Sequence, residues 1–313
     1  MKKLFNLKRI MLIFLIVIVS LVLVYHKNIV RLYTAITLYD QDKIANNFVT
    51  MYQSFNATVI PASTQPFQFP VDAKILPASF ASGDSQISTQ GFIKASQTSG
   101  LLVLKHGKIV YENYWLGQDS SKQHISFSMA KSFVSALMGI AIEDGFISSI
   151  DASVSDYVPE LMGSGYQDVS IKNVLQMSSG VRFNEDYGDF NSDINRFSRA
   201  TAFGTSLDKF TASLKGERAA GTYHHYVSID TQVLGMVLTR ATGKSLTHYL
   251  SEKIWQPLGM EHPAFWLADD NGMELALGGL NVTLRDYAKL GWLYLNLGQW
   301  QNAQGQVQQI VPK

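Results

Sequence analysis

The sequence predicts an α/β protein of the α+β kind, preceded by a single transmembrane helix. Three stretches predict this arrangement: residues 10–25 are apolar and uncharged, residues 101–111 have the pattern of a strand hairpin, and residues 126–145 have the pattern of a buried helix. A chain of 313 residues with 46% hydrophobic content is long enough for one large domain or two closely packed ones.

The composition narrows the classes of function. A formal net charge of +1 gives no electrostatic reason to expect a nucleic-acid partner. Cysteine is absent, which removes disulfides, thiolate metal sites, a catalytic cysteine and a lipidated cysteine. The adjacent His224 and His225 do not share a face in a helix or a strand, so they do not favour a metal site. We therefore expect no metal and no organic cofactor.

The amino terminus predicts an uncleaved membrane anchor. Four positive charges precede the apolar run: Lys2, Lys3, Lys8 and Arg9. They place the amino terminus in the cytoplasm. The run is slightly long for a signal-peptide core and slightly short for a spanning helix, and no A-x-A-like cleavage site follows it. A cleaved signal is therefore the weaker of the two interpretations.

These features divide the chain into four parts: a cytoplasmic tail (1–9), a transmembrane signal anchor (10–27), a linker (28–80) and a folded domain (81–313). We expect a single-pass protein of the bacterial inner membrane, with the domain on the periplasmic or extracellular side. Within the linker, residues 29–51 could continue as an exposed helix with a polar break at 40–43. Residues 61–77, with four prolines, predict an extended segment.

The predicted domain begins with a hairpin and continues into a helix that carries chemistry. Strands at 101–105 and 108–111 flank a Gly-containing turn. On the following helix Ser128 and Lys131 lie three residues apart, hence on one face, among mostly apolar positions. Burial should lower the pKa of Lys131. A serine with an amine one turn away is a form of activated nucleophile, although a lysine that merely reaches solvent is the simpler alternative.

The tetrapeptide Ser128-Met129-Ala130-Lys131 has the S-x-x-K form, and with it the chain resembles the serine β-lactamase and penicillin-binding-protein superfamily. More narrowly, it is similar to the class C β-lactamase-related hydrolases, a branch that includes esterases and 6-aminohexanoate-dimer hydrolase. The resemblance runs from about residue 80 to the last residue. It implies a β-lactamase/transpeptidase-like fold, in which an antiparallel sheet is flanked by helices beside an all-α subdomain.

The resemblance also implies further site residues. Tyr226-Val227-Ser228 matches the Tyr-x-Ser form of the second motif, with Tyr223 as a weaker candidate for the tyrosine. Ser228, in place of an asparagine, would orient the site and disfavours efficient β-lactam hydrolysis. The segment 183–197 has no clear period and should form a rim loop, in which Tyr187 and Asp193 are either substrate contacts or ordinary surface residues.

The third motif of the superfamily, Lys-Thr-Gly or His-x-Gly on a strand, does not follow Tyr226. The last residues of the chain resemble the middle of the family's sequence pattern. We therefore expect that the domain is C-terminally truncated, that its last strands are missing, and that residues 1–313 alone are poorly folded and inactive.

The expected function is a membrane-anchored serine hydrolase. Ser128 would be the nucleophile and form an acyl-enzyme, Lys131 would assist its deprotonation, and Tyr226 would serve as general base and acid. The substrate would be a small ester, amide or peptide-like molecule. The alternatives are a penicillin-binding carboxypeptidase or β-lactam receptor, and a non-catalytic scaffold of the same fold.

Overall fold

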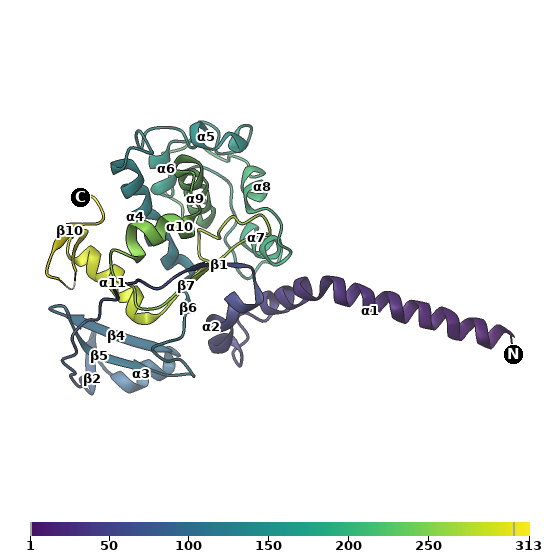
Figure 1. Cartoon of the computed structure of the whole chain (residues 1–313), viewed down its shortest axis with the longest axis horizontal. Helices are drawn as coiled ribbons and strands as arrows, with labels where there is room; N and C mark the ends of the chain where they lie inside the picture. Colours follow the sequence, from purple (N-terminus) through teal and green to yellow (C-terminus); the bar gives the residue numbers. More distant parts are fainter. Residues whose placement is uncertain (1, 303) are drawn as a thin grey trace.

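The computed structural model describes residues 2–302 and 304–313. Its first helix, α1 (Lys2–Ile36), extends away from the rest of the chain (Figure 1). The part from Lys8 to Ile36 is long and apolar enough to cross a membrane, and its most apolar 18-residue window has a mean hydropathy of 2.5 and is not buried against the protein. By length and composition it is a candidate span, and a signal sequence near an amino terminus meets the same criteria.

The domain end of α1 is joined to the body by a buried arginine. Arg31 is 5% exposed, and its guanidinium lies 3.1 Å from Asp270 and donates a hydrogen bond of 2.5 Å to Asn56. Asn56 in turn donates to the same carboxylate oxygen of Asp270 at 2.6 Å. Because α1 continues without interruption through this contact, the apolar helix and the body are held by a hydrogen-bonded joint.

A four-stranded antiparallel sheet forms the centre of one layer. Its strands follow the order β1 (Ala57–Ile60), β7 (Ala264–Leu267), β8 (Leu280–Val282) and β6 (His124–Ile125). β1 and the helix before it, α2 (Ile44–Ser54), both lie in the segment expected to be a linker. In the structure these residues are part of the folded body, and irregular chain follows β1 up to residue 78.

The remaining strands form two-stranded units. These are β2 (Ser79–Ser82) with β3 (Ser85–Ser88), β4 (Gly100–Lys105) with β5 (Lys108–Tyr114), and β9 (Gln299–Gln301) with β10 (Val307–Gln309). The predicted hairpin at 101–111 is confirmed as β4–β5. His106 and Gly107 between its strands both have positive φ, 52° and 71°, as two-residue hairpin turns require.

Helices make up the rest of the body. They are α3 (Thr89–Ala95), α4 (Ala130–Glu143), α5 (Val154–Tyr157), α6 (Ile171–Leu175), α7 (Asp193–Ala202), α8 (Leu207–Ala212), α9 (Ser228–Thr242), α10 (Leu246–Leu250) and α11 (Leu284–Leu295), with 3₁₀ turns at Phe127–Met129 and Pro159–Leu161 and a π turn at Ser251–Trp255. α5, α6, α7 and α8 surround α9 in Figure 1. Helices thus cluster on one side of the sheet, as expected for an α+β protein.

The core is organised around α4 and α9, which pack against each other. Phe133, Val134 and Leu137 of α4 are fully buried, whereas Ser132 and Ser135 on the same helix are exposed. The apolar pattern of the sequence therefore correctly separated the buried positions from the face that carries Lys131. α9 is buried along nearly its whole length, which explains why its sequence shows little amphipathic character.

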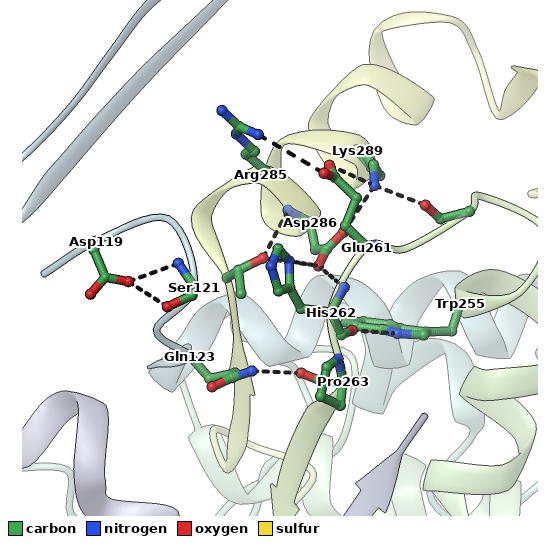
Figure 2. A network of polar contacts seen from close by, with 12 residues as sticks. Asp119, Ser121, Gln123, Trp255, Glu261, His262, Pro263, Arg285, Asp286 and Lys289 are labelled. Carbon is green, nitrogen blue, oxygen red and sulfur yellow. Dashed lines mark hydrogen bonds and ion pairs between the residues drawn. The ribbon is translucent and has the colours of Figure 1, made fainter. Parts of the chain in front are cut away.

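A cluster of buried charges ties α11 to the chain before β7 (Figure 2). Lys289 is fully buried, 3.0 Å from Asp286 and 3.2 Å from Glu261. The carboxylate of Asp286 also accepts the backbone N–H groups of Glu261 and His262 at 2.7 and 3.0 Å. Each buried charge is therefore paired, which is the condition under which burial is tolerated. The cluster fixes α11 against the chain that leads into β7.

Candidate active site

The predicted nucleophile lies in a turn between strand β6 and helix α4. The N–H of Ser126 donates to the carbonyl of Leu280 at 2.7 Å, which ties the turn to β8. Residues 127–129 form a 3₁₀ turn, and α4 begins only at Ala130. The sequence had suggested that Ser128 lies within the α-helix, but in the structure Ser128 precedes it.

Phe127 explains this difference. Its φ is +43°, a left-handed conformation that a continuous right-handed helix cannot contain and that costs a non-glycine residue about 1–2 kcal/mol. The backbone of Phe127 also passes close to Gly278, where an added Cβ would lie 3.3 Å from the Cα of Phe127. The strained backbone leaves Ser128 exposed at the surface. Strained residues of this kind concentrate at functional sites.

Lys131 points from the first turn of α4 to Ser128. Its ammonium donates to Oγ of Ser128 at 3.1 Å and to the carbonyl of Leu277 at 2.7 Å. Burial lowers the pKa of Lys131, while the neighbouring Tyr226 and Glu185 act in the opposite direction. An amine with a lowered pKa, held against a serine hydroxyl, is suited to proton transfer.

Tyr226 completes a three-residue arrangement around the serine. Its hydroxyl donates to Oγ of Ser128 at 2.8 Å, and Nζ of Lys131 lies 5.4 Å from the centre of its ring. The competing Tyr223 lies elsewhere: its ring is 4.7 Å from the guanidinium of Arg218. The geometry therefore favours Tyr226 as the tyrosine of the site. A hydroxyl, an amine and a phenol in mutual contact can move a proton off and back onto the serine oxygen.

Ser228, expected to orient the site, is held by a carboxylate that the sequence did not identify. Ser228 is buried at the start of α9, and its N–H donates to Oε2 of Glu185 at 2.9 Å while its hydroxyl donates to Oε1. The N-cap residue of α9, Val227, offers no capping side chain. Glu185 takes that place from 43 residues away, and a carboxylate at a helix N-terminus is electrostatically favourable.

The two rim residues differ in their surroundings. Tyr187 is 58% exposed, and burial of the rest of its ring raises its pKa to about 12, with smaller contributions from Glu185, Tyr39 and Tyr226. Asp193, in contrast, accepts the N–H of Asn184 at 2.8 Å and pairs with Arg196 at 2.9 Å. Its carboxylate holds the loop to α7.

The first turn of α9 also contains a buried carboxyl group. Asp230 is fully buried, and Tyr166 donates to its Oδ1 at 2.7 Å, while Oδ2 has no partner among the described residues. Burial raises the pKa of Asp230 to about 7. The group therefore titrates close to neutral pH, two residues from Ser228.

Two open, mainly apolar clefts flank the nucleophile turn. One, of about 470 Å³, is lined by Ser126, Phe127 and the start of β4. The other, of about 630 Å³, is lined by Lys131, Ser132, Ser135 and side chains of α6, α9 and α11. Met129 and Tyr287 line both clefts. Ser128 itself lines neither cleft, although its neighbour Met129 lines both, so a largely apolar ligand could lie next to the nucleophile turn.

Comparisons with known proteins identify the family of the chain. A family model described as Beta-lactamase matches residues 90–312. Among curated proteins, the 6-aminohexanoate-dimer hydrolase of Paenarthrobacter ureafaciens is 32% identical over 208 residues, which covers 64% of this chain and 53% of that protein. Protein flp of Staphylococcus aureus strain COL is 25% identical over 181 residues, 53% of this chain and 34% of that protein. The chain thus spans about half or less of these relatives.

Solved structures show the same fold. A Bacillus anthracis protein provisionally described as a 6-aminohexanoate-dimer hydrolase superposes with a TM-score of 0.79 at 23% identity, covering 88% of this chain and 73% of that one. A class C β-lactamase superposes with a TM-score of 0.51 at 23% identity, covering 68% and 64%. The expected β-lactamase/transpeptidase-like fold is confirmed. The chain belongs to the Beta-lactamase family.

Proposed function

We propose that the protein is a membrane-anchored serine hydrolase that cleaves a small ester or amide through an acyl-enzyme on Ser128. The observation that carries the proposal is the contact of Ser128 Oγ with both Lys131 and Tyr226, at 3.1 and 2.8 Å. The two apolar clefts that Met129 lines, next to the serine in sequence, support a neutral substrate with an apolar acyl or leaving group. The curated relative named for an amide dimer supports amides among the candidates.

In the proposed mechanism Tyr226 reacts as the phenolate, which the ammonium of Lys131 stabilises. The phenolate takes the proton of Ser128 as Oγ attacks the substrate carbonyl carbon. The tetrahedral intermediate then collapses, and Tyr226 returns the proton to the departing alcohol or amine. Water attacks the acyl-enzyme in the same way and releases the acid. The backbone N–H of Ser128 would be one donor to the oxyanion.

Glu185 and Ser228 would keep Tyr226 in place. Ser228 stands two residues after Tyr226 and is tied by two hydrogen bonds to Glu185. The segment that carries the phenol is thereby joined to the rim loop that carries Tyr187. We assign Ser228 and Glu185 positioning roles, and Tyr187 a contact with the substrate. Asp193 has no such role in the proposal, because its carboxylate is already paired within the loop and α7.

A fluorophosphonate probe, which reacts with activated serines, tests the assignment. The complete protein in membranes should be labelled at Ser128, and Ser128→Ala should abolish labelling. Ser132→Ala is the matched control, because Ser132 is an exposed serine next to Lys131. Labelling that persists in Ser128→Ala would show that another serine reacts. Trapping of a labelled penicillin by the wild-type chain would favour a penicillin-binding enzyme over an ester or amide hydrolase.

The membrane anchor is tested separately. Protease added outside spheroplasts should digest the body while an amino-terminal tag stays protected. A soluble mature protein that begins after residue 25 would identify the apolar helix as a cleaved signal instead.

A further inference from the structure

Two aromatic rings from the chain just after the candidate membrane span lie against the nucleophile turn. Tyr39, in the turn between α1 and α2, is stacked on Phe127 with ring centres 6.2 Å apart and an interplanar angle of 27°. Phe48, on α2, meets the same ring edge-on at 5.0 Å. Tyr39 and Phe48 also contact each other at 6.1 Å. The three rings form one cluster, which we call the aromatic clamp.

The clamp holds the residue that determines where the nucleophile points. Phe127 directly precedes Ser128 and has the left-handed φ of +43° described above. A conformation of this kind persists only where its surroundings enforce it. The backbone of Phe127 lies so close to Gly278 that a Cβ added there would come within 3.3 Å of it, and its side chain is confined by Tyr39 and Phe48. Phe48 also contacts His124 at 5.4 Å, so the clamp touches strand β6, which leads into the turn, as well as the turn itself.

We propose that Tyr39 and Phe48 are positioning residues that keep Phe127 left-handed and so hold Oγ of Ser128 within reach of Lys131 and Tyr226. The proposal rests on the proposed role of Ser128 as nucleophile. It gives the segment between the apolar helix and the sheet a part in the site, although both residues lie before the family match that begins at residue 90.

The test compares substitutions that remove one ring at a time in the full chain. Tyr39→Leu and Phe48→Leu should each slow fluorophosphonate labelling of Ser128, and kcat for p-nitrophenyl acetate, by roughly 10- to 100-fold, since a misplacement near 1 Å has that effect. For this small ester KM should change much less than kcat. Tyr39→Phe keeps the ring and loses only the hydroxyl, so it should retain wild-type labelling and kcat.

Tyr33→Leu is the matched control. Tyr33 is a tyrosine of α1 with 59% exposure, and its ring lies 5.5 Å from Nζ of Lys43. It should label at the wild-type rate. Wild-type rates in both Tyr39→Leu and Phe48→Leu overturn the positioning role, and so does an equal loss in Tyr33→Leu. Tyr39→Leu decides the matter if Phe48→Leu does not fold, because Tyr39 is half exposed. Labelling of Ser128→Ala would instead overturn the nucleophile assignment.

Discussion

Replacing Glu185 by glutamine removes one charge at the point where the rim loop meets the first turn of α9. The carboxylate accepts two hydrogen bonds from Ser228, one from the N–H at 2.9 Å and one from the hydroxyl. Glutamine keeps one carbonyl oxygen of nearly the same shape. It loses the second acceptor and the negative charge. Glu185→Gln therefore tests the charge of the side chain while its size stays nearly the same.

The cost in stability follows from these contacts. A hydrogen bond to a charged group contributes about 1.5–3 kcal/mol and a neutral one about 0.5–1.5, so the exchange should cost about 1–2 kcal/mol. Loss of the favourable charge at the helix N-terminus adds about 0.3–1 kcal/mol, part of which the first figure already includes. Glu185→Ala leaves the buried N–H and hydroxyl of Ser228 without their acceptor and should cost about 2–4 kcal/mol. At roughly 2–4 °C per kcal/mol, Glu185→Gln should lower Tm by about 2–8 °C.

The same substitution should alter the pH profile of the reaction. Glu185 raises the pKa of Lys131, so its neutralisation should lower that pKa further. In the proposed mechanism the protonated amine stabilises the phenolate of Tyr226, and activity falls when Lys131 loses its proton. The alkaline limb of kcat/KM should therefore move to lower pH in Glu185→Gln.

Thermal unfolding and a pH series of ester hydrolysis on the same preparations measure both effects. Asp186→Asn is the control, because Asp186 is the next residue, is exposed, and its carboxylate accepts the N–H of nearby Gly188. It should leave the alkaline limb and Tm close to wild type. An alkaline limb that stays in place in Glu185→Gln, despite the lower Tm, would refute the electrostatic link between Glu185 and Lys131.

Three further predictions concern buried charges. Lys289→Met should cost about 3–5 kcal/mol, measured by chemical unfolding, because Asp286 and Glu261 lose their buried partner; a loss below 1 kcal/mol would contradict this. Burial raises the pKa of Asp230 to about 7 in the folded state, so its contribution to stability falls as pH rises from about 4 to 7. Asp230→Asn does not titrate and should therefore gain stability relative to wild type over that range. A stability difference that stays constant with pH would contradict this. The carboxylate of Asp286, 3.6 Å away, raises the pKa of His262, so protonated His262 should stabilise the fold below about pH 6.5 and lose this effect at higher pH. His262→Gln should therefore be less stable than wild type at pH 5.5, by under about 1 kcal/mol, and as stable as wild type at pH 9.

The sequence was sufficient where local patterns decide the structure. The β4–β5 hairpin follows from two apolar runs around His106-Gly107. The face of α4 that carries Lys131 follows from small and polar residues spaced one turn apart. Each of these features depends on residues within a few positions of one another.

Contacts between distant segments were not readable. Nothing near Ser228 indicates that Glu185 will cap its helix, and nothing near Phe127 indicates that Tyr39 and Phe48 will confine it. The strand β1 was missed because its pairing with β7 joins residues about 200 positions apart. For α7, a local signal was present: Ser192 caps the helix by accepting the N–H of Asn195 at 3.3 Å, and Asp193 follows it.

The joint at Arg31 would affect how far the candidate active site lies from a bilayer. From the end of the apolar run at Tyr25 to the end of α1 at Ile36, an uninterrupted helix rises about 16 Å. Arg31 fixes this rod to Asp270 and Asn56, so the body cannot swing as it would on a flexible tether. Under the anchor proposal, Tyr39 would stay at a nearly constant height above the lipid headgroups. Substrates would then be selected by how far they extend from the bilayer as well as by their chemistry.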